Sequence, residues 1–256
     1  MSMTDAEIFA SYLRRLGVTA PASPSLAALT ELMGRHLLTV PFENLDVMAK
    51  SPRALSTAGV LTKVAVDARG GFCYELNEAF RALLDHLGFI VHRIEARVWQ
   101  APSQRFGAPF DHLALVARLP DGEYLVDVGF GDGNRVPLRL PEDQAEDISG
   151  VHRLAPARDG YLLLSSPSQP LYEMTLTDQP LDAFEPRCRF HQTSSESIFS
   201  QGLICTRATA TGRITLSRNR LIVVEHGRRT ESLTSDVGAA LREHFSIENP
   251  GAVDVV

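Results

Sequence analysis

The sequence predicts an α+β protein in which a helical region comes first and a run of strands follows. Apolar residues recur at helical spacing up to Gly88 and alternate along the chain after it. The dipeptide Asp121-Gly122 joins two alternating segments, which is typical of an antiparallel hairpin. Because helices and strands occupy separate runs, this order favours α+β over a doubly wound parallel sheet.

Three helices are expected ahead of the glycine-rich stretch at residues 69–71. Thr4-Asp5-Ala6-Glu7 has the pattern of a capping box and Gly17 that of a C-terminal stop, so a first helix lies between them. Ser25 can cap a second helix, which Pro41 ends. A third helix is expected at about 57–68.

Strands are expected from Ile90 onward, where apolar residues alternate as far as Val98. Two prolines and a glycine predict a loop at 100–110. The hairpin strands are expected at 112–117 and 124–128. Further elements are expected as strands at 161–164, 172–176, 203–208, 213–216 and 221–225, and as helices near 181–190 and 234–245.

The composition is ordinary for a soluble globular protein, with 44% apolar and 22% charged residues in 256. Residues 1–5 contain no basic region and no apolar run, so we expect no signal peptide, and no stretch is long enough to span a membrane. The three cysteines lie far apart, which fits the reducing cytoplasm better than a disulfide framework. The net charge of −6 argues against nucleic-acid partners. The oligomeric state is open, and a homodimer is one arrangement that the sequence allows.

Cys73 is the strongest candidate nucleophile. It begins a helical stripe of apolar residues that ends at Gly88 and comprises Leu76, Phe80, Leu83, Leu84 and Leu87. At a helix start, unpaired N–H groups and the helix dipole stabilise a thiolate, so we expect a lowered pKa. Gly70 and Gly71 allow a tight turn and leave space for a substrate beside the sulfur. The alternative for a lone cysteine is simple packing, and this is what we expect of Cys188 and Cys205.

A thiolate nucleophile needs a base, and the base needs a group to orient it. His112 and Asp127 can supply both from neighbouring strands, and a carboxylate within the apolar run 125–128 is costly unless it is paired. Their distance depends on the hairpin. A loop of 117–122 makes them direct partners, a loop of 119–122 makes them diagonal neighbours, and a two-residue Asp-Gly turn separates them by two pairs. A purely structural hydrogen bond of His112 is the alternative.

Three motifs in the chain closely resemble those of the arylamine N-acetyltransferases. They are RGGFCYELN at 69–77, PFENLD at 41–46 and VDVGFG at 126–131, with His112 between the first and the last. The resemblance covers about the first 140 residues well and the remainder loosely. It implies an N-terminal helical domain (1–88), a central antiparallel β-barrel domain (89–186) and a C-terminal α/β lid (187–256) around a cysteine-protease-like or transglutaminase-like core.

The resemblance also implies a reaction. Cys73 takes an acetyl group from acetyl-CoA and passes it, through a thioester and a ping-pong mechanism, to an arylamine or arylhydrazine. His112 accepts the amine proton and Asp127 orients the imidazole. Small-molecule amines or hydrazines and acyl-CoA are therefore the expected partners. No metal is expected, since Cys73 stands alone and no histidine pair has ligand spacing.

Residues for substrate contact are expected near the motifs. The loop that begins Gly129-Phe130-Gly131 lacks the dinucleotide fingerprint, because its third glycine comes too early and Pro137 blocks a following helix. It fits the thiol arm of an acyl-CoA instead. An aromatic amine can pack on Phe42, Trp99 and Phe130, for each of which core packing is the alternative. By resemblance, Arg15, Glu43 and Arg69 form a buried ionic network that supports the site.

The segment 187–229 carries eight arginines against two glutamates on an otherwise acidic chain. Such a cationic region suits a small polyanionic ligand such as an acyl-CoA, whereas solvated arginines on outer strand faces are the alternative. Within it, 187–199 follows the family's polar motif only loosely, because Cys188, His191 and Ser195 stand where other residues are usual.

Other functions use the same residues. A thiol hydrolase or transglutaminase-like enzyme would pass the acyl group to water or a lysine. An amide synthase of the same family would close a macrolactam on a carrier-bound polyketide. A non-catalytic binding module is disfavoured, because it has no use for three spaced Cys, His and Asp residues.

Overall fold

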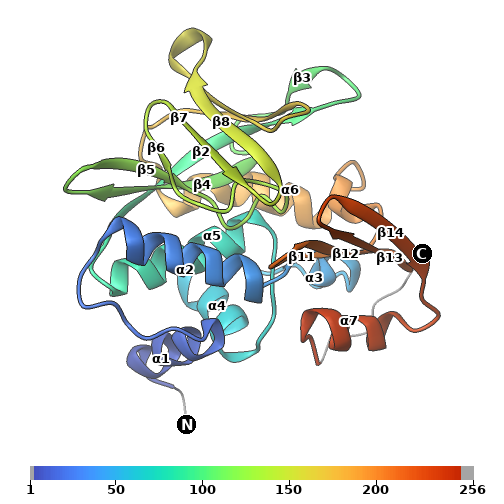
Figure 1. Cartoon of the computed structure of the whole chain (residues 1–256). Helices are drawn as coiled ribbons and strands as arrows, with labels where there is room; N and C mark the ends of the chain where they lie inside the picture. Colours follow the sequence, from blue (N-terminus) through green and yellow to red (C-terminus); the bar gives the residue numbers. More distant parts are fainter. Residues whose placement is uncertain (1–2, 249–256) are drawn as a thin grey trace.

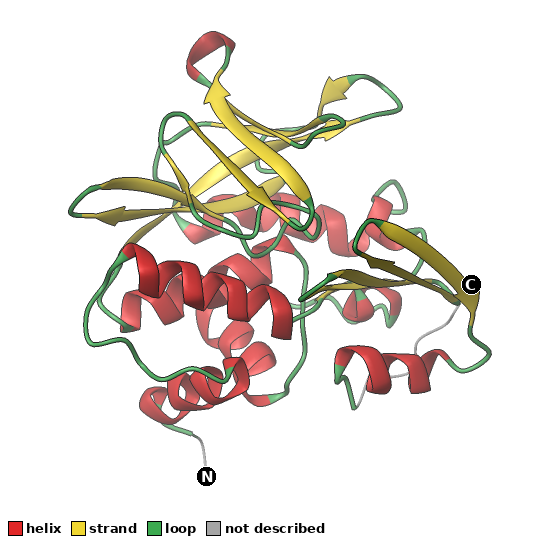
Figure 2. Ribbon diagram, viewed as in Figure 1, coloured by secondary structure: helices red, strands yellow, loops and turns green. Residues whose placement is uncertain are grey.

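The helices of the N-terminal region lie beneath a barrel of strands, and a smaller sheet lies beside them (Figure 1). The computed structural model describes residues 3–248. Figure 2 separates the helical part, the barrel and the C-terminal sheet with its helix, which confirms the expected α+β fold class. Domain boundaries at 88 and 186 stay a prediction.

The N-terminal helices begin and end at the expected caps. The Thr4 side chain accepts the Glu7 N–H, Gly17 ends the first helix in the left-handed conformation, and the Ser25 side chain accepts the Ala28 N–H. The helix expected at 57–68 continues as a π-helical turn, η1. The elements are α1 (Asp5–Leu16), α2 (Leu26–Thr39), α3 (Leu45–Met48), α4 (Thr57–Leu61), η1 (Thr62–Val66) and α5 (Cys73–His86).

The barrel is a nine-stranded antiparallel sheet whose two end strands, β6 and β7, approach each other. The Arg139 N–H donates to Asp143 Oδ2 across 2.7 Å at this junction. Its strands are β2 (Ile90–Gln100), β3 (Arg105–Phe106), β4 (His112–Leu119), β5 (Gly122–Val126), β6 (Leu138–Arg139), β7 (Asp143–Asp147), β8 (Gly150–Pro156), β9 (Leu162–Ser165) and β10 (Pro170–Met174).

Strand β4 has two buried faces, and this places the site. Leu113, Leu115 and Ala117 belong to the core shared with α5, whereas Ala114 and Val116 belong to the core inside the barrel. A strand buried on both sides reads as a continuous apolar run. Its first residue, His112, is therefore on the side that faces the barrel interior, next to the helical layer.

The C-terminal sheet includes a strand from the N-terminal region, which the sequence did not reveal. Its order is β1-β11-β12-β13-β14, and Phe42 of β1 pairs with Thr206 of β11. The elements of this part are β1 (Phe42–Glu43), η3 (Leu181–Phe184), α6 (Glu185–Thr193), η4 (Ile198–Ser200), β11 (Ile204–Thr209), β12 (Gly212–Ser217), β13 (Arg220–Glu225), β14 (Arg228–Leu233) and α7 (Val237–Phe245).

Three longer strands were not expected from the sequence. The residues of β14 are all exposed, and β7 is largely polar, so neither carries an apolar alternation that could be recognised. In strand β8 the alternation of buried and exposed residues is weak and is limited to the surroundings of His152 and Leu154. Between residues 3 and 248, no helix is both long and apolar enough to cross a membrane.

Candidate active site

The hairpin of β4 and β5 decides whether His112 and Asp127 can meet. Arg118 pairs with Glu123 and Leu115 with Val126, so the register is that of the 119–122 loop. Extended by one pair, this register makes His112 and Asp127 diagonal neighbours on one face. His112 Nε2 lies 2.7 Å from Asp127 Oδ2, and both side chains are buried. The expected hydrogen bond is confirmed.

Asp127 is fixed by three further donors, two from other elements and one from its own loop. Its Oδ2 also accepts the Tyr172 hydroxyl at 2.9 Å, and its Oδ1 accepts the Asn77 amide at 2.9 Å and the Gly129 N–H at 2.8 Å. Burial alone would raise the pKa of Asp127, but His112, Asn77 and Gly129 together lower it below its ordinary value. Asp127 is therefore an ionised carboxylate with a single orientation.

Asn77 joins Cys73 to this carboxylate. Asn77 is four residues after Cys73, on the same face of α5. It donates to the Leu113 carbonyl at 2.6 Å and accepts the Val128 N–H at 3.0 Å, which ties the helix start to β4 and the 127–133 loop. Its helical spacing from Cys73 was a signal that the sequence offered, whereas nothing in the sequence linked Tyr172 to Asp127.

The expectation of a lowered pKa at Cys73 was wrong for the free protein. Cys73 is the first residue of α5, as predicted, but it is only 4% exposed. Burial raises the pKa of its thiol well above the ordinary value, and the Leu113 backbone opposes this only in part. A thiolate here therefore needs a proton acceptor in addition to the helix dipole.

The glycines before Cys73 serve a different purpose from the expected one. A Cβ on Gly70 would lie 2.0 Å from the Pro41 carbonyl oxygen, and neither Gly70 nor Gly71 lines the cavity described below. Gly70 leaves room for the Pro41 backbone, and Gly71 leaves room for the Glu75 side chain, which a Cβ there would approach to 2.6 Å; neither makes space for a substrate. Gly129 is the glycine that allows close approach to the nucleophile, because a Cβ there would lie 2.8 Å from Cys73 Cα.

Cys73 and His112 line one cavity of about 1170 Å³. Its wall also includes every residue expected to contact substrate, namely Phe42, Trp99, Gly129, Phe130 and Gly131. The Phe130 ring stands edge-on to the His112 ring at 5.3 Å. Cys188 and Cys205 are buried away from this cavity, so their expected packing role is confirmed.

Some arginines of 187–229 line the cavity, as expected for a polyanionic ligand, and others are exposed on the surface, as the alternative predicted. Arg187, Arg213 and Arg229 line the cavity, together with Arg135 from the barrel. Arg213 is 15% exposed and pairs with Asp132, which is 80% exposed. The others are exposed, or are structural like Arg207, which donates to the Leu38 and His244 carbonyls.

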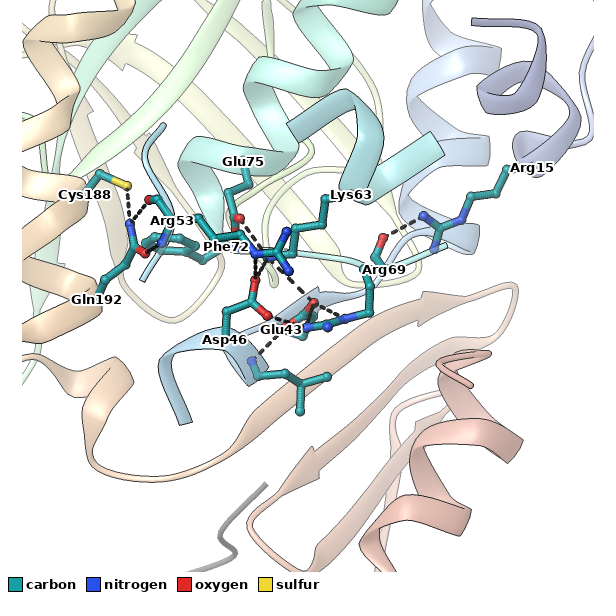
Figure 3. A network of polar contacts seen from close by, with 11 residues as sticks. Arg15, Glu43, Asp46, Arg53, Lys63, Arg69, Phe72, Glu75, Cys188 and Gln192 are labelled. Atoms are coloured by element: carbon teal, nitrogen blue, oxygen red, sulfur yellow. Dashed lines mark hydrogen bonds and ion pairs between the residues drawn. The ribbon is translucent and has the colours of Figure 1, made fainter. Parts of the chain in front are cut away.

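A buried ionic network supports the start of α5 (Figure 3). Arg69 pairs with Glu43 at 2.9 Å, as expected, and with Asp46 at 3.2 Å. Lys63, which the sequence did not single out, lies 2.7 Å from Glu75 and 2.9 Å from Asp46. Glu75 also accepts the Phe72 N–H, so the network holds the residue before Cys73.

Arg15 does not join the ion pairs, which corrects the expectation for it. Among the described residues its guanidinium donates to the backbone carbonyls of Val64 and Arg69, and Figure 3 shows the contact to Arg69. Burial lowers the pKa of Arg15 to about 10. It connects α1 to η1 and to the turn before Cys73, so it supports the site through backbone contacts.

A second histidine–carboxylate pair lines the same cavity, and the sequence missed it. His191 Nε2 lies 3.0 Å from Asp111 Oδ1, its Nδ1 lies 3.1 Å from Ser197 Oγ, and Arg187 lies 2.6 Å from the same Asp111 oxygen. Asp111 directly precedes His112. No adjacent strand supplies His191 with a carboxylate, because it is on α6, so only the folded chain shows the pair.

No group of three or more His, Cys, Asp and Glu side chains in the described part of the chain is placed to hold a metal ion. The site thus consists of a buried thiol, an imidazole paired with an ionised carboxylate, and an aromatic cavity with cationic walls. This arrangement can attack an acyl carbon and transfer the group.

Comparisons with known proteins agree with this geometry. Residues 25–251 match the family model described as N-acetyltransferase. An arylamine N-acetyltransferase of Mycolicibacterium smegmatis is 32% identical over 250 residues, which cover 93% of this chain and 90% of the relative.

Solved structures are similar over nearly the whole chain. The Mycobacterium marinum arylamine N-acetyltransferase in complex with CoA has a TM-score of 0.87 at 29% identity and covers 95% of this chain and 94% of its own. A Bacillus cereus arylamine N-acetyltransferase, described as having a unique Cys-His-Glu catalytic triad, has a TM-score of 0.86 at 25% identity, with 96% and 99% covered. Here the carboxylate beside the histidine is Asp127.

Proposed function

Because the chain belongs to the arylamine N-acetyltransferase family, we propose that it moves an acetyl group from acetyl-CoA to an arylamine or arylhydrazine nitrogen, through a thioester on Cys73. The observation that carries this proposal is the His112–Asp127 pair, bonded at 2.7 Å, on the same cavity as Cys73. Cys73 is the nucleophile, His112 the base and Asp127 the residue that orients it.

The first half-reaction forms the acetyl-enzyme. His112 takes the proton of the Cys73 thiol, which burial otherwise keeps protonated, and the sulfur attacks the thioester carbonyl of acetyl-CoA. The carbon–sulfur bond to CoA breaks, and the CoA sulfur leaves with the proton from His112. The Cys73 N–H at the start of α5 is the candidate donor to the oxyanion.

The second half-reaction releases the product. The amine nitrogen attacks the acetyl carbon on Cys73, His112 accepts the amine proton, and the Cys73 sulfur leaves. Asp127 holds Nε2 of His112, so Nδ1 is the nitrogen that exchanges protons in both halves. The lowered pKa of Asp127 keeps it ionised, which stabilises the imidazolium that forms.

Separate parts of the cavity wall support the proposed binding of each substrate. Gly129 and Gly131 line the approach to Cys73 without side chains, which suits the thiol arm of CoA. Arg213, with an exposed carboxylate as its partner, suits a CoA phosphate. Phe42, Trp99 and Phe130 offer faces on which an aromatic amine can pack.

Mass spectrometry of the intact protein with acetyl-CoA alone tests the thioester. We expect one added acetyl group in the wild type and none in Cys73→Ala. An arylamine should remove the group and yield the acetylated amine, with parallel lines in double-reciprocal plots. If the adduct decays as fast without amine as with it, the thiol-hydrolase alternative replaces the transferase.

Location and assembly are part of the proposal. The described cysteines are all free thiols, which supports a location in the reducing cytoplasm. A homodimer remains an expectation, which light scattering after size exclusion would test. The amide-synthase alternative requires a carrier-bound acyl chain as donor, so activity with free acetyl-CoA counts against it.

A further inference from the structure

Arg187 is an arginine that its neighbours hold in one position. Its Nε and Nη2 both contact Asp111 Oδ1, at 2.7 and 2.6 Å, and its guanidinium carbon lies 4.1 Å from the centre of the Phe190 ring. One edge of the guanidinium is thus fixed by a carboxylate and one face by an aromatic ring. A guanidinium held in this way loses little conformational freedom on binding a ligand.

Within the described residues 3–248, the outer edge of Arg187 has no protein partner. Nη1 donates no hydrogen bond to any residue in 3–248, the side chain is 23% exposed, and Arg187 lines the cavity. The Nη1 and Nη2 hydrogens on that edge form a fork that matches the two oxygens of a carboxylate.

Asp111 is held by hydrogen bonds and ion pairs within the protein. Its Oδ1 also lies 3.0 Å from His191 Nε2, and His191 in turn contacts Ser197 Oγ. Arg187 and His191 together lower the pKa of Asp111 against the effect of burial. Asp111 therefore stays ionised and holds Arg187, so the arginine is positioned at the cavity wall without its outer edge being covered.

The rest of the cavity suits an aromatic anion. Four arginines line it against three acidic residues, one of which is the strongly exposed Asp132. Aromatic rings stand near Arg187 in sequence and on the same wall, among them Phe190 and Phe199. Such a wall binds a flat ring and a negative substituent together.

We propose that Arg187 binds the anionic substituent of the acceptor, so that the preferred acceptors are aromatic amines that carry a carboxylate. The role of this contact in binding an acetyl acceptor rests on the proposed function, whereas the binding of an aromatic carboxylate at Arg187 does not. His191 and Ser197 act as positioning residues, because they hold Asp111 and through it Arg187. Arg187, His191 and Ser197 all belong to 187–199, the segment that is expected from the sequence to follow the family's polar motif only loosely.

The first experiment compares two acceptors of similar size, 4-aminobenzoate and 4-methylaniline, with Arg187→Met. We expect kcat/KM for 4-aminobenzoate to fall about 10- to 100-fold, as for the loss of a charged hydrogen-bond pair, and kcat/KM for 4-methylaniline to change less than about twofold. Arg189→Met is the matched control, since Arg189 is exposed on the same helix and lies off the cavity.

The anion that meets Arg187 could also be a phosphate of the donor, and a second arm separates the two. Formation of acetyl-Cys73 from acetyl-CoA, without an acceptor, should have the same dependence on donor concentration in wild type and Arg187→Met. A raised requirement for acetyl-CoA, with unchanged acceptor preference, would assign Arg187 to the donor and overturn the proposal.

A binding measurement keeps the proposal testable without turnover. The single tryptophan, Trp99, lines the cavity, so its fluorescence reports occupancy directly. In a Cys73→Ala background, 4-aminobenzoate should bind more tightly than 4-methylaniline, and Arg187→Met should abolish the difference. If the wild type forms no acetyl-enzyme, the proposed function fails, yet this difference would still support the anion site.

Removal of Arg187 alone leaves Asp111 with one partner fewer, so the double variant Arg187→Met/Asp111→Asn removes the pair together. It should lose the preference for 4-aminobenzoate and keep activity toward 4-methylaniline. Equal losses for both acceptors in both variants would show that the pair is only structural. An unchanged preference in a folded variant would show that the carboxylate binds elsewhere.

Discussion

At the scale of single residues, Asp127 shows how the fold keeps a charge in its interior. Its two oxygens are shared by four donors, of which His112, Tyr172 and Asn77 come from three other elements and Gly129 from the same loop. Burial of a carboxylate is costly without such partners, and here they lower its pKa despite burial. The same contacts fix the orientation of the imidazole, which links stability to chemistry at one residue.

Replacement of Asp127 by asparagine should preserve the fold and abolish most activity. The amide can donate where the carboxylate only accepts, so it favours the wrong tautomer of His112 and no longer stabilises imidazolium. Acetyl-enzyme formation should slow by about 10⁴-fold, as in serine triads with the equivalent change. Rapid-quench mass spectrometry measures this rate, and circular dichroism checks the fold. Near-normal rates in a folded variant would make Asp127 structural.

Cys73 should be the first thiol to react with iodoacetamide. Burial raises the pKa of Cys73, Cys188 and Cys205 alike, so no helix-start effect alone separates them. Only Cys73 of the three lines the cavity that holds His112. Peptide mapping after brief alkylation at pH 7.5 should find the label on Cys73, and a denatured sample is the control for intrinsic reactivity. Uniform labelling of the native protein would contradict this.

At the scale of elements, the turn before α5 holds three parts of the chain together. The Glu43 N–H donates to the Gly71 carbonyl at 2.9 Å, and Glu43 also belongs to β1, which pairs with β11. Gly70 packs directly on the Pro41 carbonyl. The position of Cys73 therefore depends on a contact between the backbone of 41–43 and that of 70–71.

A methyl group at residue 70 should loosen this contact. Because its Cβ would lie 2.0 Å from the Pro41 oxygen, Gly70→Ala must displace backbone, and we expect a loss of about 2–4 kcal/mol, in the range of overpacked and strained sites. Gly34→Ala is the control, since nothing lies within 4 Å of the new methyl group inside α2. It should stabilise by about 0.5–1 kcal/mol. Urea denaturation measures both, and equal effects would refute the packing argument.

At the scale of the whole molecule, a buried carboxylate connects the helical layer to the barrel. Glu78 of α5 accepts from Arg93 of β2, at 2.6 Å, from Arg81 and from Thr57 at the start of α4. Burial alone would raise the pKa of Glu78, but these donors lower it. Its stabilising effect is therefore present above the pKa of the unfolded chain, about 4.3, and is lost as the pH falls through the lower folded value.

Glu78→Gln should therefore destabilise the protein at pH 7 and much less at pH 3. A neutral side chain forgoes the ion pairs at every pH, whereas the wild type loses them only when Glu78 is protonated. At pH 7 the melting temperature should fall by roughly 4–12 °C, for a cost of about 2–3 kcal/mol. Calorimetry from pH 7 to pH 3 measures how the difference in melting temperature between the wild type and Glu78→Gln changes. Glu142→Gln, at an exposed position, is the control and should leave the melting temperature unchanged. If the difference between wild type and Glu78→Gln stayed the same at every pH, the proposed dependence on Glu78 ionisation would be contradicted.

The local features of this protein could be predicted from its amino-acid sequence. The capping box at Thr4, the cap at Ser25 and the helix that starts at Cys73 were predicted because the groups that satisfy a helix end lie within four residues of it. The Cys, His and Asp residues could be selected because a charge within an apolar strand requires a partner. The hairpin register was limited to three cases, of which one was found.

Contacts between residues that are distant in sequence became known only from the folded chain. Tyr172 and Asn77 reach Asp127, His191 reaches Asp111, and β1 joins the C-terminal sheet, across separations of up to about 160 residues. No periodicity encodes such pairs, because side-chain spacing constrains neighbours on one element and not contacts between elements. The burial of Cys73 was decided in the same way. A helix dipole acts locally and favours a thiolate, but the close packing of β4 and of Gly129 against Cys73 buries the residue, and burial raises the pKa of its thiol instead.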